Sequence, residues 1–218
     1  MILFKGGLIY DGTGTEPFKG DILVENDKII KVEESILPEE GWETVDLTGL
    51  SVSSGFIDAH SHNDWFAIKK EPQKYFEPFI RQGITSFITG NCGLSKDDSC
   101  LYMTDAWVED HGIQNPAIYD CFPKFLKFSL CGTGDTMPNT IRKMTGAVAD
   151  RFSIKERGYI KPGYYADLTV FDEGKLRNGE PDQEAAFGIE KVYINGINVL
   201  DGNNLDSEAI KHTGKAMR

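Results

Sequence analysis

Short apolar clusters alternate with turn-forming residues along the first quarter of the chain. The clusters are rich in β-branched residues and fall at residues 2–4, 8–10, 22–24, 29–30 and 45. Glycine, asparagine, aspartate and proline separate them, as expected between short strands. This spacing predicts a small β-sandwich or barrel over residues 1–53.

The last quarter of the chain, residues 158–218, has the same pattern. A strand is predicted at residues 166–171 and a hairpin over residues 191–200, turning at Asn195-Gly196. Neither chain end has enough strands to close a fold alone, so we expect the two sets of strands to pair with each other. The prediction is one composite β-sandwich domain built from residues 1–53 and 158–218.

Strand and helix signals alternate in the middle of the chain, residues 54–157. A short buried strand is predicted at residues 55–58 and another at residues 84–89. Between them, residues 71–82 have helical spacing, although Pro78 must kink or restart the helix. Strand, helix and strand in this order predict a parallel β-α-β unit.

A later helix is predicted further along the middle segment. Asn139 is suited to cap its N-terminus. Ile141, Met144, Val148 and Phe152 then fall on one helical face. The predicted fold class is therefore α/β plus β, with the mixed middle segment inserted between the two halves of the β domain.

Composition and charge exclude several classes of protein. The 218 residues are 40% apolar and 26% charged, which allows a sizeable core, and no apolar run is long enough to span a membrane. With 23 basic and 34 acidic residues the formal charge is −11, which repels phosphate backbones and disfavours nucleic-acid binding. The first ten residues lack the apolar run of a signal peptide, so we expect a cytoplasmic protein.

The strongest chemical signal is the pair His60 and His62. They follow the predicted strand at 55–58, beside Asp58 and Asp64. At a period of two residues, both imidazoles point to the same side of the strand, which suits two ligands of one metal ion. A lone histidine is more often an ordinary hydrogen-bonded polar residue, but this spacing favours a metal site.

Cys92 and Asp105 are weaker candidates for the same site. Cys92 comes at the end of the second predicted strand, where a thiolate could complete a zinc site, although a buried structural thiol is the usual alternative. Asp105 follows the apolar segment 101–103 and would lie at a strand end. A carboxylate there can bind a metal and take a proton from its bound water, although most such aspartates are caps.

The remaining cysteines, histidines and glycines are given structural roles. Four cysteines without a C-x-x-C pair do not form a disulfide framework, and Cys100, Cys121 and Cys131 are expected to be buried free thiols. His111 and His212 are expected to face solvent. The glycine-rich segment 132–134 is interpreted as a turn, because no helix suited to a phosphate loop follows it.

These residues carry a resemblance to a known family. Residues 54–62, Ser-Gly-Phe-Ile-Asp-Ala-His-Ser-His, resemble the metal-dependent amidohydrolase superfamily. Gln82-Gly83-Ile84-Thr85 leading to Gly90-Asn91-Cys92-Gly93 is similar to its N-acyl-D-amino acid deacylase (D-aminoacylase) branch. Further similar segments lie at residues 103–107, 121–126, 141–145, 157–168, 188–190, 195–196 and 212–214.

The resemblance implies a function and a role for each candidate residue. His60 and His62 would be metal ligands, Cys92 the thiolate ligand of zinc, and Asp105 both a ligand and the general base. The reaction implied is zinc-dependent hydrolysis of a non-peptide C–N bond in an N-acyl amino acid, releasing a carboxylate and a free D-amino acid. The fold implied for the middle segment is a TIM-type (β/α)₈ barrel.

The chain departs from the family in the length of that barrel. Only twelve residues separate Cys92 from Asp105, and residues 54–157 number 104, whereas a whole barrel needs roughly 200. The middle segment can therefore be only a truncated barrel, with equivalents of the first, second and last strands. Two further histidine ligands of the family have no counterpart, so we expect at most one zinc site.

The truncation leaves the function open between three alternatives. The chain could be a zinc-dependent amidohydrolase, a non-catalytic remnant that folds through its β-sandwich, or a cyclic-amide hydrolase resembling hydantoinases and dihydroorotases. The cysteine at Cys92 disfavours the third, because those relatives usually rely on a modified lysine. Residues 115–117 read Asn-Pro-Ala where the family has His-Pro-Arg, which puts the usual substrate-carboxylate contact in doubt. Open strand edges in a truncated barrel would also favour homo-oligomers or aggregation.

Overall fold

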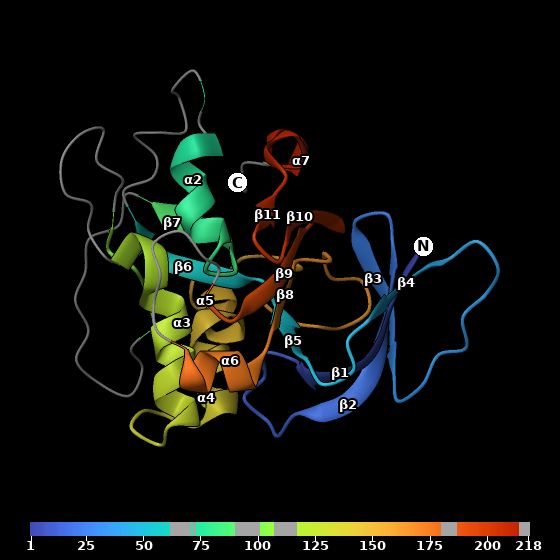
Figure 1. Ribbon diagram of the computed structural model, residues 1–218, viewed down its shortest axis with the longest axis horizontal. Coiled ribbons are helices and arrows are strands. Elements are labelled where there is room, and N and C mark those ends of the chain that lie inside the picture. The colour runs from blue at the N-terminus through green and yellow to red at the C-terminus, as the bar shows by residue number, and fades with distance from the viewer. Residues whose placement is uncertain (62–70, 72, 90–100, 107–116, 180–186, 214–218) are drawn as a thin grey trace.

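The computed structural model describes residues 1–61, 71, 73–89, 101–106, 117–179 and 187–213. Within them, a large mixed sheet built from both chain ends lies beside a small parallel sheet and a group of helices (Figure 1). The strands are β1 (Ile2–Tyr10), β2 (Phe18–Glu25), β3 (Lys28–Glu33), β4 (Glu43–Asp46), β5 (Ser51–Ser54), β6 (Phe56–Ser61), β7 (Ile84–Thr89), β8 (Leu168–Phe171), β9 (Ile189–Ile194), β10 (Ile197–Asp201) and β11 (Asn204–Leu205). The helices are α2 (Gln73–Ile80), α3 (Ala117–Leu130), α4 (Met137–Met144), α5 (Gly146–Arg151), α6 (Glu173–Asn178) and α7 (Ser207–Thr213).

The two chain ends form one continuous sheet, as predicted. Its order is β11-β10-β9-β8-β5-β1-β2-β3, with β4 attached in parallel to β1. The junction is β5, which pairs in parallel with β1 and antiparallel with β8. All four residues of β5 and all four of β8 are buried, so the join between the ends lies in the interior.

The large sheet curls around a core of its own. Phe4 on β1 and Tyr193 on β9 meet edge to face with their ring centroids 4.8 Å apart, although β5 and β8 lie between their strands in the sheet. Contact across two intervening strands requires the sheet to bend over itself, as in a sandwich. Branched and aromatic side chains from β1, β2, β3, β8 and β9 fill the space enclosed.

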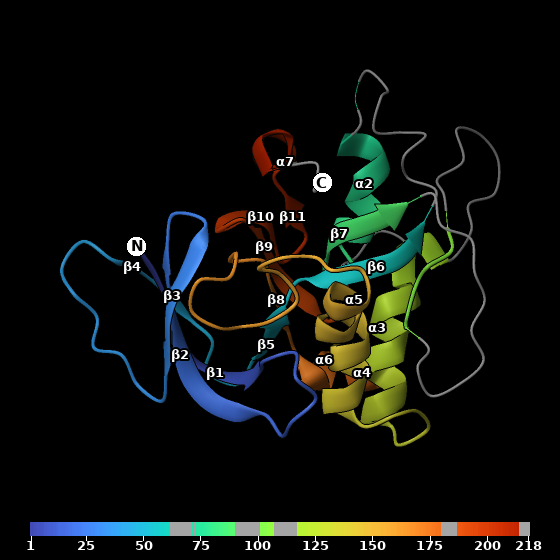
Figure 2. The same cartoon turned by 180° about the vertical axis from the view of Figure 1, so that it is seen from behind.

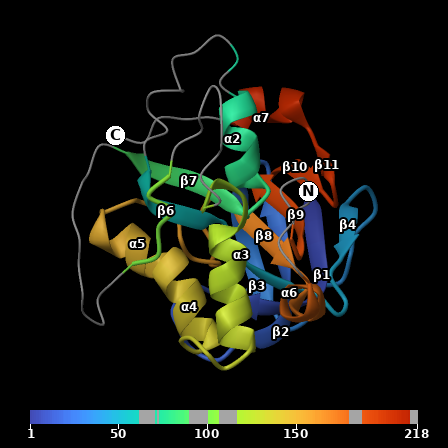
Figure 3. The same cartoon turned by 60° about the vertical axis from the view of Figure 1, so that its left-hand side comes forward.

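The predicted β-α-β unit is present in the middle segment. β6 and β7 pair in parallel, with α2 between them in sequence and Pro78 inside that helix (Figure 3). Every residue of β6 is buried. Phe56 stacks on Phe122 of α3, whereas Ile57 and Ala59, which point the other way, pack with residues of α5. Helices therefore cover both faces of β6.

The helix predicted to begin at Asn139 is in fact two helices. The N-cap of α4 is Thr136, and Asn139 lies inside the helix, where its amide donates a hydrogen bond of 2.6 Å to Asp135. The backbone leaves the helical region at Thr145 (φ −137°, ψ −96°), and α5 starts at Gly146. Only glycine fits at the start of α5, because a Cβ at Gly146 would lie 2.4 Å from the carbonyl oxygen of Gly12.

The apolar side of the interrupted helix was nevertheless identified correctly in most positions. Ile141, Met144 and Val148 are fully buried, whereas Phe152 lies beyond the end of α5 and is partly exposed. Helix α3, the longest of the described helices, was not predicted. Pro123 lies in its interior, and a proline there normally argues against a helix.

The side chain of Gln82 forms hydrogen bonds with the backbone of the first turns of α3. Its side chain is fully buried, and its Nε2 donates to the carbonyl oxygens of Ala117 (3.2 Å) and Ile118 (2.6 Å). Its Oε1 accepts a 3.1 Å hydrogen bond from the backbone N–H of Phe122, the group that would otherwise bond to Ile118. The amide thus replaces a helical hydrogen bond and attaches α3 to the β6–β7 unit.

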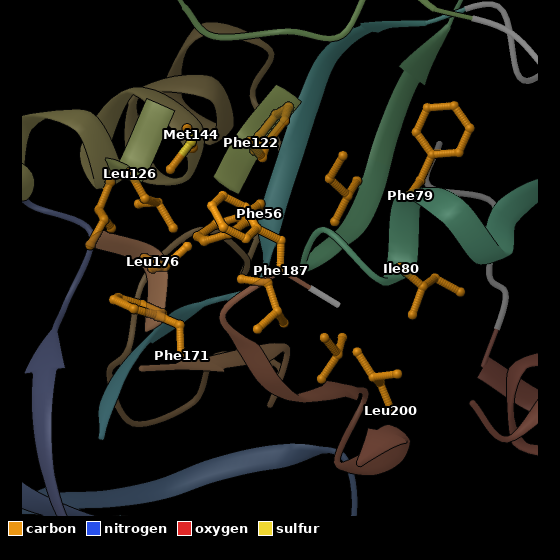
Figure 4. Close-up of a cluster of buried hydrophobic side chains, with 14 of the residues drawn as sticks. Phe56, Phe79, Ile80, Phe122, Leu126, Met144, Phe171, Leu176, Phe187 and Leu200 are labelled. Atoms are coloured by element: carbon orange, nitrogen blue, oxygen red, sulfur yellow. The ribbon is translucent and has the colours of Figure 1, made fainter. Parts of the chain in front are cut away.

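A large apolar cluster joins this unit to the sheet. It combines Phe56, Phe122 and Met144 from the middle segment with Phe171 and Leu200 from the large sheet (Figure 4). The sheet and the helices therefore share this apolar cluster. Seen from behind, α5 lies directly below β6, against which it packs (Figure 2). None of the helices in the described ranges is long and apolar enough to cross a membrane.

Replacing Gln82 tests the attachment of α3. We expect Gln82→Ala to lower the free energy of unfolding by about 2–3 kcal/mol, because two buried hydrogen bonds and one partly buried hydrogen bond to the α3 backbone are lost. Urea denaturation followed by circular dichroism measures this. Asn203→Ala, which removes an exposed amide, is the control and should change stability by less than about 0.5 kcal/mol. Equal effects in the two variants would show that the Gln82 bonds do not stabilise the fold.

Candidate functional site

The described part of the candidate site lies at the carboxyl end of β6. Asp58 and His60 alternate with Ile57 and Ala59 and so share one side of the strand. The segment 101–106 runs beside them and brings Thr104 and Asp105 close, 46 residues after Asp58 in the case of Thr104. The polar groups of β6 and of segment 101–106 are distant in sequence and come together only in the tertiary fold.

His60 and Asp105, two of the predicted ligands, face each other. His60 Nε2 lies 3.2 Å from Asp105 Oδ1, and the Asp105 backbone N–H donates to the His60 carbonyl oxygen at 3.1 Å. The His60 side chain is 9% exposed and that of Asp105 is 66% exposed. One group is thus held in the protein while the other is open to solvent.

The separation of these two atoms fits a shared metal ion. Two donors about 2.0–2.1 Å from one tetrahedral zinc lie about 3.3 Å apart. The observed 3.2 Å between Nε2 and Oδ1 matches that separation. The described residues contain no group of three or more metal-ligating side chains, and the other predicted ligands, His62 and Cys92, lie outside the described residues.

Asp58 occupies the buried floor of the site. Its Oδ1 accepts hydrogen bonds from the backbone N–H groups of Thr104 (3.0 Å) and His60 (3.3 Å), and its Oδ2 accepts one from the Thr104 hydroxyl (2.5 Å). Burial raises the pKa of Asp58 to about 6, and the negative charge of Asp105 adds to the rise. The hydrogen bonds from Thr104 and His60 act in the opposite direction by favouring the carboxylate.

The segment before Asp105 is not the strand that was expected. Residues 101–106 have no regular secondary structure, and Asp105 has a left-handed backbone (φ 47°). A residue in that conformation interrupts an extended ladder. The Asp58 side chain, rather than strand pairing along the segment, holds Thr104 beside β6. Sequence reasoning named Asp58 as a neighbour of the histidines but missed Thr104, which has no sequence signal of its own.

The structure places some of the other residues singled out from the sequence, and others lie outside the described residues. His212 lies on α7 and is exposed, as expected for a solvent-facing residue, although it is helical and not in a loop. The turn at residues 132–134 is present. Cys121 is partly buried, but Cys131 is exposed, so the expectation of a buried thiol was wrong there, because the chain turns outward after α3. His111, Asp64 and Cys100 lie outside the described residues.

Cys121 is next to the site but is not activated. Its Sγ lies 3.5 Å from the carbonyl oxygen of Met103, to which it donates. Burial raises the pKa of Cys121 to about 12, and the charges of Asp58 and Asp120 add to the rise. A thiol in this environment stays protonated at neutral pH and is a poor nucleophile.

This environment predicts unequal alkylation of the two described thiols. At pH 8, iodoacetamide should modify exposed Cys131 at least about tenfold faster than Cys121, whose thiolate fraction is about 10⁻⁴ at a pKa of about 12. Peptide mapping by mass spectrometry at several times gives both rates. In guanidinium chloride the rates should converge, and equal rates in the native protein would contradict the burial of Cys121.

Comparison with curated proteins finds relatives that match part of the chain. No family model matches. D-aminoacylase of Alcaligenes xylosoxydans xylosoxydans is 37% identical over 95 residues, which are 43% of this chain and 19% of that protein. N-acyl-D-aspartate deacylase of the same organism is 33% identical over 93 residues, 43% of this chain and 18% of that protein. The matched part thus spans about a fifth of these relatives, and this chain has less than half the residues of the first.

A longer but weaker match points to a neighbouring group. Dihydroorotase of Aquifex aeolicus (strain VF5) is 28% identical over 159 residues, 73% of this chain and 34% of that protein. Its alignment is longer than those of the deacylases, and its identity is lower.

Comparison with solved structures shows the same fold. The crystal structure of D-aminoacylase that defines a novel subset of amidohydrolases aligns with a TM-score of 0.72 and 14% identity, covering 94% of this chain and 97% of that one. N-acyl-D-glutamate deacylase from Bordetella bronchiseptica, complexed with zinc and a phosphonate mimic of the tetrahedral intermediate, aligns with a TM-score of 0.70 and 14% identity. That alignment covers 91% of this chain and 96% of the deacylase.

Proposed function

The chain is a homologue of the D-aminoacylases, in the amidohydrolase superfamily, and on that basis we propose that it is a zinc-dependent amidohydrolase with a single metal site. Its ligands are His60, His62, Cys92 and Asp105. Its substrate is a small N-acyl amino acid or a related amide, cleaved at a non-peptide C–N bond to a carboxylate and a free D-amino acid. The observation that carries the proposal is the 3.2 Å approach of His60 Nε2 to Asp105 Oδ1 at the end of β6.

The residues of the chain divide the chemistry between them. Bound zinc supplies Lewis acidity at this position. His60 presents Nε2 from a buried strand, so its position is rigid, whereas Asp105 extends its carboxylate into solvent. The exposed carboxylate is placed to accept a proton from an attacking water molecule and to return it to the leaving amine.

The middle segment is best explained as a remnant of a barrel. We infer that β6, α2 and β7 correspond to the start of a (β/α)₈ barrel, inserted as residues 54–157 into the β-sandwich domain of residues 1–53 and 158–218. Parallel pairing of β6 with β7 supports this assignment, as does the fold shared with D-aminoacylase. The equivalent of the last strand is not a strand in the described segment 101–106.

The second candidate function is a non-catalytic remnant of such an enzyme. The observation in its favour is the length of the chain, which has room between Cys92 and Asp105 for only twelve residues. In this case the composite β domain is the stable part of the protein and the metal site has lost its activity. The length of the dihydroorotase alignment favours a third candidate, a cyclic-amide hydrolase. Cys92 argues against this candidate, because such enzymes usually rely on a modified lysine in place of a cysteine.

Zinc content is the first test of the enzyme proposal. We expect about one zinc ion per chain by elemental analysis of the purified protein, and much less in His60→Ala and Cys92→Ala, because each removes a proposed ligand. His212→Ala, which removes an exposed histidine on α7, is the matched control and should keep the metal.

A substrate panel completes the test. Protein with about one zinc should release amino acids from N-acetyl-D-amino acids and not from their L-enantiomers, measured by amine detection. Zinc near zero in the parent protein would refute the enzyme proposal and leave the non-catalytic remnant. Hydrolysis of dihydroorotate or hydantoin, without hydrolysis of any N-acetyl amino acid, would instead identify the chain as a cyclic-amide hydrolase.

A further inference from the structure

The segment that carries Asp105 is attached to the protein in an unusual way. Although residues 101–106 are neither helix nor strand, Thr104 is 6% exposed and Ala106 fully buried. Thr104 is bound through both its backbone N–H and its hydroxyl, and both bonds end on the Asp58 carboxylate. One buried side chain of β6 therefore holds the backbone on the N-terminal side of Asp105.

The backbone of Asp105 needs such support. Its φ of 47° lies in the left-handed region, which is sparsely populated by residues other than glycine, although aspartate adopts it more often than most, and contacts around Asp105 favour it. The contacts are the bonds from Thr104 to Asp58 and the 3.1 Å bond from the Asp105 N–H to the His60 carbonyl oxygen. Together they place Asp105 Oδ1 beside His60 Nε2.

Asp58 has no role as a ligand in this arrangement. Asp58 is fully buried, and its two carboxylate oxygens together accept three hydrogen bonds. One of those bonds comes from the N–H of His60 itself. The same carboxylate thus contacts the backbone of one proposed ligand and the residue preceding the other.

We infer that Asp58 and Thr104 form a positioning pair that sets the distance between His60 and Asp105, and thereby the metal affinity of the site, without binding the metal. This inference rests on the proposed function. Outer partners of this kind commonly change metal affinity by about 10–100-fold when they are removed. Here the Thr104 hydroxyl can be removed while every proposed ligand and the Asp58 carboxylate itself are kept.

The test compares Thr104→Val with Thr104→Ser in the full chain. Valine keeps the shape of threonine and loses the hydroxyl, whereas serine keeps the hydroxyl. Zinc affinity is measured by competition with a chromophoric chelator, and the visible spectrum of the Co²⁺-loaded protein reports the ligand arrangement. We expect Thr104→Val to bind zinc about tenfold or more weakly with altered Co²⁺ bands. Thr104→Ser should stay within about threefold of the parent.

Thermal melts of the metal-free proteins separate positioning from folding. A Thr104→Val protein that melts like the parent and binds zinc more weakly supports the positioning role. Parent-like zinc affinity and Co²⁺ bands in Thr104→Val overturn it while leaving the proposed function intact. A parent protein that binds no zinc overturns the proposed function and, with it, the positioning role.

Discussion

A buried ion pair between Arg157 and Asp167 holds together the C-terminal part of the chain, which pairs with the N-terminal part where β8 meets β5. The second guanidinium nitrogen of Arg157 donates to Asn195 Oδ1 at 2.7 Å, and Asp167 accepts from the Asn195 backbone N–H at 2.8 Å. Asn195 also donates to the carbonyl oxygen of Thr213 in α7. Because Arg157 and Asp167 are almost fully buried, losing either would leave an uncompensated charge in the core.

The backbone of Asp167 also contacts the residue that precedes the candidate site's strand. The Asp167 carbonyl oxygen accepts a 2.8 Å bond from Gly55 N–H, one residue before β6. Gly55 is confined there, since a Cβ would lie 2.2 Å from Thr85 Oγ1 of β7. From this start, β6 carries Phe56 into the shared apolar cluster and Asp58 and His60 toward the site. A backbone hydrogen bond thus connects Asp167 to the start of β6, and β6 leads to the site.

Helix packing accounts for the burial of β6. In the described residues its sheet has two strands, yet all six β6 residues are buried. The Phe122 ring of α3 covers one face, and Val148 and Ala149 of α5 cover the other. Two parallel strands would be unstable in water without such cover, because parallel sheets need both faces protected. In this chain the helices, held partly by Gln82, supply that protection.

The sequence by itself determined the elements whose signals are local. Alternating apolar residues and tight turns identified most strands of both chain ends and the Asn195-Gly196 hairpin. The break expected between the clusters at 2–4 and 8–10 is instead an irregularity within the single strand β1, and β5 was not predicted. Tertiary structure decided the rest. Helix α3 forms with Pro123 in its interior, and Gln82, distant in sequence, supplies hydrogen bonds to its first turns. The helix predicted from Asn139 is interrupted at Thr145. Thr104 reaches Asp58 across 46 residues, and no local pattern encodes a contact of that range.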